Sequence, residues 1–160
     1  MCNGIKAMKT MGNKKILTIG GSLAVVGALG FVGYANRRLF LVNDVTTGES
    51  DAYPDLRSRV YYADTGKVLE AAEQAIRSLP RWRVLVSDLD NDTVDAEVET
   101  PIGGFMDDVS VYATNIGHSQ TRVVIRSRSR QSGGDLGQNA MHIRELQEAM
   151  DDRLQADAAI

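Results

Sequence analysis

The sequence predicts an α+β domain whose antiparallel sheet is covered by helices on one face, preceded by an N-terminal transmembrane helix. Three observations lead to this prediction. Residues 16–36 carry no charged side chain. Further along, two segments place apolar residues at helical spacing, and four segments between them alternate apolar and polar residues. The order helix, four strands, helix is typical of an α+β domain.

The charges divide the chain near residue 43. Residues 1–42 have a net charge of +6, with six basic and no acidic side chains, whereas residues 43–160 have 12 basic and 21 acidic side chains, a net charge of −9. An acidic domain repels phosphates, so this balance excludes a basic nucleic-acid-binding protein. The 118 residues of the acidic part suit one domain with one core.

The uncharged segment predicts a single-pass membrane anchor. Residues 16–35 form a 20-residue apolar run, and a helix of that length spans about 30 Å, the thickness of the hydrocarbon core. Four lysines before the run and two arginines after it favour a cytoplasmic N-terminus, with the domain outside the cytoplasm at the cell membrane. A cleavable signal peptide is the alternative, because Gly33-Tyr34-Ala35 fits a small-x-small cleavage site.

These features predict the organisation of the chain and its partners. We expect a short basic segment at 1–15, the anchor at 16–36, a tether at 37–58 and the α+β domain at 59–156. The expected partners are the lipid bilayer and an unknown protein or anionic ligand. Small residues recur every four positions at Gly20, Ala24 and Ala28, a pattern through which two spans could form a homo-oligomer, although a glycine-rich anchor that does not self-associate has the same composition.

The first element of the domain is a helix. Asp64 or Thr65 can cap its N-terminus, and Pro80 stops it. Its apolar stripe consists of Val68, Leu69, Ala72, Ala75, Ile76 and Leu79.

Four strands follow this helix, at residues 82–86, 93–99, 109–113 and 121–129. The first is rich in branched and aromatic residues, and the others alternate apolar with polar side chains, as half-buried strands do. A further short strand is compatible with residues 59–63. The loop SGGDLGQN then leads to the last helix, whose stripe is Ile143, Leu146, Met150 and Leu154.

Four pieces of the sequence carry a resemblance to a known family. They are NDVTTG at 43–48, LPRWRV at 79–84, FMDDV at 105–109, and SRSR followed by GGDLGQN at 127–139. Over about residues 42–154 the chain resembles the bacterial family called domain of unknown function 1499. That resemblance implies a small α+β domain, often membrane-associated, and it implies no reaction. The family commonly has arginines in the first turn of the last helix, where this chain has Ala140 and His142.

The best candidate for a functional surface is an arginine row beside the glycine loop. Backbone N–H groups of a glycine loop that enters a helix can bind an anion, and arginines can add bidentate contacts. In the structural alternative, Asp135 or Asn139 caps the helix, and the arginines pair with Asp107, Asp108 or the outward carboxylates across the sheet. The proposed surface comprises Arg126, Arg128, Arg130, Gly133, Gly134, Asp135, Gly137 and Asn139.

No pattern predicts a catalytic residue, a metal site or a cofactor. Asp88, Asp90, Asp92 and Glu99 have the spacing of a calcium loop, but Thr93 stands where that loop needs glycine, and an Asp/Asn turn explains the same residues. We expect His118 and His142 to be solvated or capping residues, because neither has a partner at metal-ligand spacing.

The functional prediction is a non-enzymatic, membrane-anchored module that binds a partner or belongs to the cell envelope. The alternative is a small membrane-tethered hydrolase or transferase that acts on an anionic substrate through Asp135 and a neighbouring arginine. A third option is a purely structural role in which the membrane span mediates oligomers.

Overall fold

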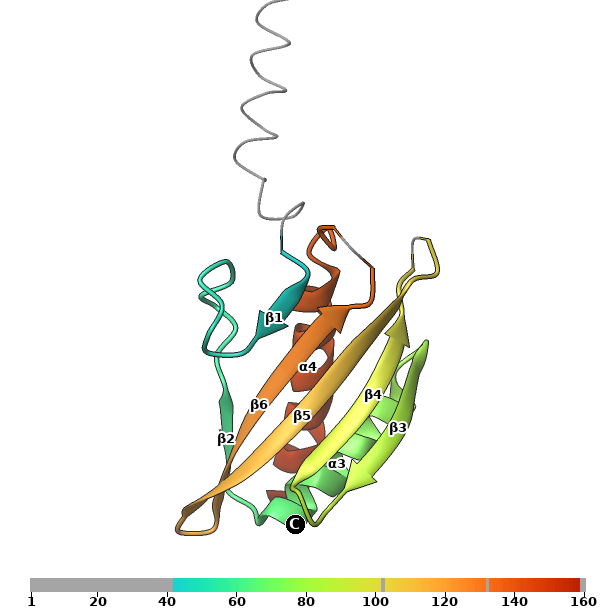
Figure 1. Cartoon of the computed structure of the whole chain (residues 1–160). Coiled ribbons are helices and arrows are strands. Elements are labelled where there is room, and N and C mark those ends of the chain that lie inside the picture. The colour runs from blue at the N-terminus through green and yellow to red at the C-terminus, as the bar shows by residue number, and fades with distance from the viewer. Residues whose placement is uncertain (1–41, 102, 132, 159–160) are drawn as a thin grey trace, which may run out of the picture. The chain divides into compact units, whose positions relative to one another are not determined.

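The computed structural model describes residues 42–101, 103–131 and 133–158, and within them it contains six strands and two helices (Figure 1). The elements are β1 (Asp44–Thr46), β2 (Arg59–Tyr61), α3 (Thr65–Ser78), β3 (Trp82–Asp88), β4 (Thr93–Glu99), β5 (Met106–Gly117), β6 (Gln120–Ser129) and α4 (Gln138–Ala158). The predicted α+β class, with an antiparallel sheet and two helices, is confirmed.

The sheet is a meander closed at one edge by two short strands. Strands β3 to β6 pair in sequence order, and the full order is β1-β6-β5-β4-β3, with every pair antiparallel. The short strands β1 and β2 both pair with β6, β1 opposite residues 126–128 and β2 opposite residues 121–123. Helices α3 and α4 cover one face of this sheet (Figure 1).

The prediction of four strands was wrong, because the sheet has six. β2 lies where a short strand was considered, whereas β1 lies in the segment expected to be a tether. Val45 of β1 is fully buried and Leu56 is 3% exposed, so the folded part begins before residue 59. A strand of three residues turns one side chain inward, which is too short for an alternating pattern to appear in the sequence.

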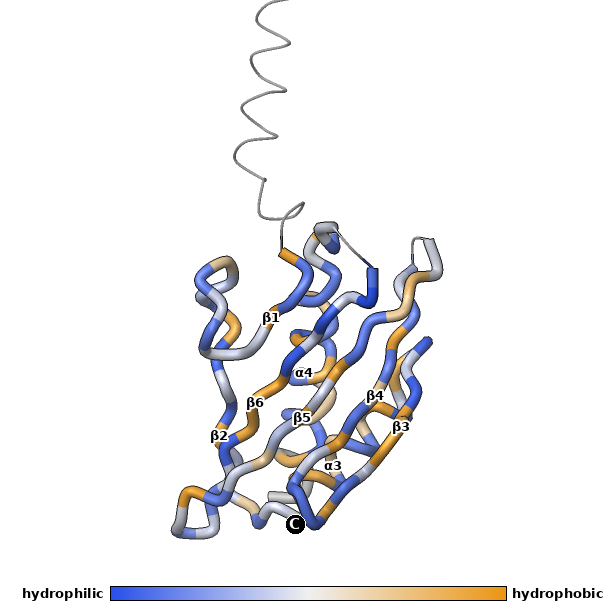
Figure 2. Tube along the Cα trace, viewed as in Figure 1, coloured by the Kyte–Doolittle hydropathy of each residue, from blue (hydrophilic) through white to orange (hydrophobic). Residues whose placement is uncertain are grey.

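The remaining helices and strands lie where the capping residues, Pro80 and the apolar periodicity of the sequence predicted them. The Asp64 carboxylate accepts a hydrogen bond from the Lys67 backbone N–H at 2.9 Å and caps α3. The helix ends at Ser78, just before Pro80. Apolar and polar residues alternate along the strands (Figure 2). Their apolar side chains form one core with the stripes of α3 and α4.

The predicted membrane span at 16–36 lies outside the described residues, as do Gly20, Ala24 and Ala28 of the predicted oligomer contact. In the part of the chain that the structure describes, no helix is both long enough and apolar enough to cross a bilayer.

Candidate functional site

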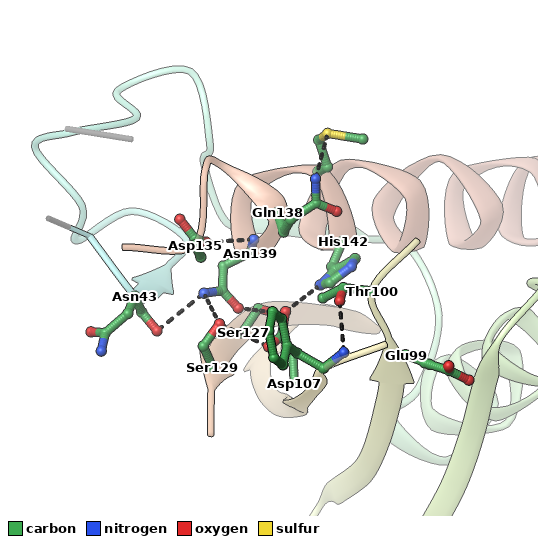
Figure 3. A network of polar contacts seen from close by, with 12 residues as sticks. Asn43, Glu99, Thr100, Asp107, Ser127, Ser129, Asp135, Gln138, Asn139 and His142 are labelled. Atoms are coloured by element: carbon green, nitrogen blue, oxygen red, sulfur yellow. Dashed lines mark hydrogen bonds and ion pairs between the residues drawn. The ribbon is translucent and has the colours of Figure 1, made fainter. Parts of the chain in front are cut away.

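A buried polar network lies where the N-terminal end of α4 meets the inner face of β5 and β6 (Figure 3). The side chains of Asp107, Ser127 and Asn139 are all fully buried there. Polar groups at such depth require partners, because each unpaired one costs free energy of order 1–3 kcal/mol. We therefore follow the partners of each group in turn.

Asp135 closes the N-terminus of α4. Its two carboxylate oxygens accept hydrogen bonds from the backbone N–H groups of Gly137, at 2.9 Å, and Asn139, at 2.7 Å. Gly137 has φ +82°, a left-handed conformation that glycine adopts without strain. The backbone N–H groups of Gly137 and Asn139 are thus taken by a carboxylate of the chain itself. At these two positions the loop has the capping role of the structural alternative.

Asn139 ties α4 to the strands. Its side-chain oxygen accepts from the Ser127 hydroxyl at 2.6 Å. Its nitrogen donates to the backbone oxygen of Asn43 at 3.0 Å and to the Ser129 hydroxyl at 3.3 Å. This side chain therefore provides a hydrogen-bond donor for the backbone oxygen of Asn43, just before β1, and so helps to hold that segment on the domain.

Asp107 is the group in this network that is least satisfied. Its Oδ1 accepts a hydrogen bond from the Ser129 hydroxyl at 2.7 Å. Its Oδ2 lies 3.5 Å from Nδ1 of His142, and neither of these two atoms has a hydrogen-bond partner among the described residues. Burial raises the pKa of Asp107 above its ordinary value, and the nearby carboxylates of Asp135 and Asp108 raise it further.

His142 is buried rather than solvated, so the expectation for this residue was wrong. Its exposed fraction is 3%, and its ring packs edge-on against Trp82 at a centroid distance of 5.7 Å. Burial lowers the pKa of His142 to about 4, which leaves the ring neutral at pH 7. The signal was present in the sequence, because positions 142, 146, 150 and 154 are four apart and share one helix face.

A pocket with a volume of about 260 Å³ opens beside this network. Gln138 lines it with a buried side-chain oxygen that has no hydrogen-bond partner among the described residues. The ring of Phe105 is half-exposed at its rim. The described lining includes two carboxylates and no basic side chain: it consists of Thr100, Phe105, Asp107, Ser129, Gln131, Gly133, Gly134, Asp135, Leu136 and Gln138.

The arginine row does not join the glycine loop. Arg126 pairs with Asp44 of β1, with Nε 2.9 Å from Oδ1. Arg130 pairs with Asp108 at 2.6 Å and with Glu97 at 2.9 Å. Because alternate residues of a strand face opposite sides, these side chains lie on the outer face, away from Ser127 and Ser129.

Arg128 lies on the same outer face, between Asp44 and Asp108 of the two neighbouring strands. Of the two expected partner acids, Asp108 pairs with an arginine, whereas Asp107 faces inward. A more open depression of about 540 Å³ on this side is lined by Asp44 and Arg126, whose opposite charges largely offset each other. Among the described strand residues, no side chain that faces outward has a buried atom without a hydrogen-bond partner.

The calcium-like spacing belongs to a turn. The Asp88 carboxylate accepts from the backbone N–H groups of Asp90, at 3.2 Å, and Asn91, at 3.1 Å, as an Asp in a tight turn does. Within the described ranges, no group of three or more His, Cys, Asp or Glu side chains is placed to hold a metal ion.

Comparison with known proteins identifies the family. The profile of the family described as protein of unknown function (DUF1499) matches residues 41–150, so the chain belongs to this family. The resemblance seen in the sequence is thereby confirmed. No curated protein matches the chain in sequence.

Three solved structures resemble the fold distantly. The di-domain ARO/CYC BexL from the BE-7585A biosynthetic pathway is 9% identical with a TM-score of 0.41, over 74% of this chain and 44% of that one. TTHA0849 from Thermus thermophilus is 10% identical with a TM-score of 0.38, over 71% of this chain and 98% of that one. CV1439 from Chromobacterium violaceum is 10% identical with a TM-score of 0.37 over the same shares. The chain spans less than half the length of BexL, and at these scores the similarities carry no functional argument.

Proposed function

We propose that this member of the DUF1499 family is a non-enzymatic binding module that takes a small ligand in the pocket beside the N-terminus of α4. We further propose that residues 16–36 anchor it in the cell membrane, with the domain outside the cytoplasm. One observation carries the binding proposal: Asp107, which is fully buried, belongs to the lining of the pocket, and its Oδ2 has no hydrogen-bond partner among the described residues.

An unsatisfied buried carboxylate destabilises a fold, so its presence calls for a reason other than stability. Asparagine at this position could accept the same hydrogen bond from Ser129 without burying a charge. A ligand with hydrogen-bond donors would supply the partner that Asp107 lacks. Strained or unsatisfied groups beside a pocket commonly mark the site where a protein binds its ligand.

Obstruction of the pocket tests the binding proposal. Gln131 is exposed at the pocket wall, so Gln131→Trp should fill the pocket while leaving the core unchanged. Gln74→Trp makes the same substitution at an exposed position of α3 and serves as the control. A library of small polar compounds is titrated into the full-length chain and followed by amide NMR. Binders should perturb residues around 100–107 and 129–138 in the wild type and in the control but not in Gln131→Trp. The absence of any binder at these residues would contradict the proposal.

The membrane anchor rests on the 20-residue apolar run and the basic residues that flank it. Its test is a reporter enzyme fused to the C-terminus that is active only outside the cytoplasm, combined with alkaline extraction of membranes. We expect an active reporter and a protein that stays in the membrane fraction. Release of a shortened chain would instead indicate cleavage near Gly33-Tyr34-Ala35.

The second candidate is a small hydrolase or transferase. Proximity of Asp107 and His142 favours it, because a carboxyl and an imidazole 3.5 Å apart beside a pocket can exchange a proton with a substrate. It would not use Asp135 with Arg126 or Arg130, because Asp135 caps α4 and these two arginines pair with acids on the outer face. Two carboxylates in the lining also disfavour an anionic substrate. Turnover in a panel of neutral esters and amides that disappears in Asp107→Asn would favour this candidate.

A further inference from the structure

We infer that the ligand of the α4 pocket is a primary ammonium group on a short alkyl chain, bound as a cation by Asp107. This inference rests on the proposed function, since it names the chemical class of the ligand for the same pocket. It differs from the anion at the glycine loop that the sequence offered as one of two interpretations.

The charges around the pocket favour a cation. The lining includes the carboxylates of Asp107 and Asp135, and it includes no lysine, arginine or histidine among the described residues. Arg130 lies near enough to act on Asp107, but this guanidinium is paired with Asp108 and Glu97 on the outer face. An ammonium ion that enters the pocket therefore meets an excess of negative charge.

The hydrogen-bonding groups favour a donor. Asp107 Oδ2 and Gln138 Oε1 are both buried acceptors, and both lack a hydrogen-bond partner among the described residues. An ammonium group carries three donors and no acceptor, so it matches the kind of partner that these atoms lack. A carboxylate or phosphate ligand would instead place acceptors against acceptors.

The neighbouring imidazole does not supply this missing donor well. His142 Nδ1 lies 3.5 Å from Asp107 Oδ2, which is too long for a good hydrogen bond, and the ring is neutral at pH 7. A neutral imidazole adds no positive charge beside Asp107, and its ring packs edge-on against Trp82.

Gln138 also belongs to the lining of the pocket. Its amide nitrogen contacts the Met141 sulfur at 4.0 Å, and its oxygen is without a hydrogen-bond partner in the described structure. The half-exposed ring of Phe105 at the rim can stabilise a cation through its face.

The size of the pocket limits the ligand. A volume of about 260 Å³ lies below the range of roughly 300–1,000 Å³ that is typical of sites for drug-sized molecules. A short alkylammonium fits a pocket of this volume, and so does the end of a lysine side chain from another protein. Both sources present the same chemistry.

The test is a set of NMR titrations of the full-length chain in detergent micelles. The probes are butylammonium, butanol and butyrate, which share a chain and differ in charge, together with a lysine whose α-amino and carboxyl groups are blocked. We expect butylammonium to perturb amides around 129–138 and to bind about ten- to a hundredfold more tightly than butanol, with butyrate weaker still. Tighter binding of blocked lysine would point to a protein partner, and tighter binding of butylammonium to a free amine.

Two neighbouring residues give a matched pair of variants. Asp107→Asn removes the inward carboxylate, whereas Asp108→Asn removes the outward one that pairs with Arg130. The first should abolish the preference for butylammonium over butanol, and the second should leave it intact. If Asp107→Asn does not fold, the wild type is titrated at decreasing pH. Protonation of Asp107 should then weaken butylammonium binding and leave butanol binding unchanged.

The outcomes separate the two proposals. If butanol or butyrate binds the pocket as tightly as butylammonium, the proposal of a cationic ligand is wrong but the proposed binding site is not. The same conclusion follows if Asp107→Asn still prefers butylammonium over butanol. If no probe and no compound of the library changes the amide NMR signals of the pocket residues, the proposed function itself is wrong.

Discussion

The two faces of the sheet carry carboxylates in opposite situations. On the outer face, Glu97 contacts Arg83 and Arg130, and Asp44 contacts Arg126, so each acid has a basic partner on a neighbouring strand or beside it. On the inner face, Asp107 has a serine and a neutral histidine. The arginine partners lower the pKa of Glu97 and Asp44, whereas burial raises that of Asp107.

This difference distinguishes the outer carboxylates, which arginines neutralise, from Asp107, for which we propose a ligand. The outer pairs form between neighbouring strands. Arg83 is directly opposite Glu97, and Arg126 reaches Asp44 on the diagonal. Glu97 and Asp108 are directly opposite each other, and Arg130 contacts both carboxylates. Opposite charges at such positions stabilise a sheet modestly and keep its open face soluble. The inner carboxylate has no such explanation. A count of charges in the sequence would have ranked the outer face first.

Removal of core volume from the inner face should have the largest effect. Ile125 is fully buried between the sheet and the helices, so Ile125→Ala should lower the free energy of unfolding by about 2–5 kcal/mol. Urea unfolding of the full-length chain measures it. Arg126→Ala, the next residue but on the outer face, is the control. A similar loss in both variants would contradict the assignment of the two faces.

Acid should destabilise the inner network through His142. Its pKa is about 4 when folded against 6.5 when free, so the neutral form stabilises the fold above pH 6.5, and this contribution is lost as the pH falls from 6.5 to 4. The loss amounts to about 3 kcal/mol at most. His142→Phe keeps the ring beside Trp82 and should flatten the fall in melting temperature over this range. An equally steep fall in the variant would show that His142 is not the cause.

Asp107 changes the stability in the opposite direction. Its folded pKa is raised, so ionisation destabilises the fold and stability is gained as the pH falls toward the ordinary value of 3.8. Asp107→Asn should remove this gain, and the wild type should therefore lose less stability in acid than the Asn variant. The two single variants separate the opposing contributions of the pair.

The N-terminal caps of α4 and α3 should contribute different amounts to the stability of the fold, because one cap is buried and the other is exposed. Asp135→Ala removes two hydrogen bonds at 9% exposure and should cost about 1–2 kcal/mol. Asp64→Ala removes one exposed hydrogen bond at α3 and should cost about 1 kcal/mol or less. Thermal unfolding of both variants makes the comparison. Equal losses would mean that burial of the α4 cap adds nothing.

Loss of an ion pair on the outer face should have the smallest effect. The side chains of Arg126 and Asp44 are 41% and 35% exposed, so Arg126→Ala should cost less than about 1 kcal/mol. Salt should reduce the difference between the wild type and this variant, because exposed charges are screened. A loss of several kcal/mol that salt does not alter would contradict a surface role for this pair.

Elements with regular periodicity were predictable from the sequence. Residues 93–99 alternate throughout, and β4 occupies the same residues. The opposite directions of Asp107 and Asp108 also follow from alternation, since neighbouring strand residues face opposite sides. β1 was not predictable from local sequence, because its three residues are held by distant parts of the chain. They pair with β6, and the Asn139 side chain donates a hydrogen bond to the backbone oxygen of the preceding residue, Asn43.

The site was harder to predict than the fold. The arginine row attracted the functional hypothesis because nothing local shows that Asp44, 82 residues away from Arg126, lies beside it. His142 escaped notice because it was judged by its spacing from possible metal ligands and not by its place on the apolar stripe of α4. Long-range pairing decides which polar groups are satisfied, and a single sequence does not display it.

The most direct test of the contrast between the faces is the map of butylammonium contacts on the wild-type chain. Carboxylates lie on both faces, so a cation attracted only by net charge would perturb amides around Asp44, Glu97 and Asp108. Our account predicts saturable perturbations around the α4 pocket, from Ser129 to Gln138, and little change on the outer face. Perturbations confined to the outer face would contradict it.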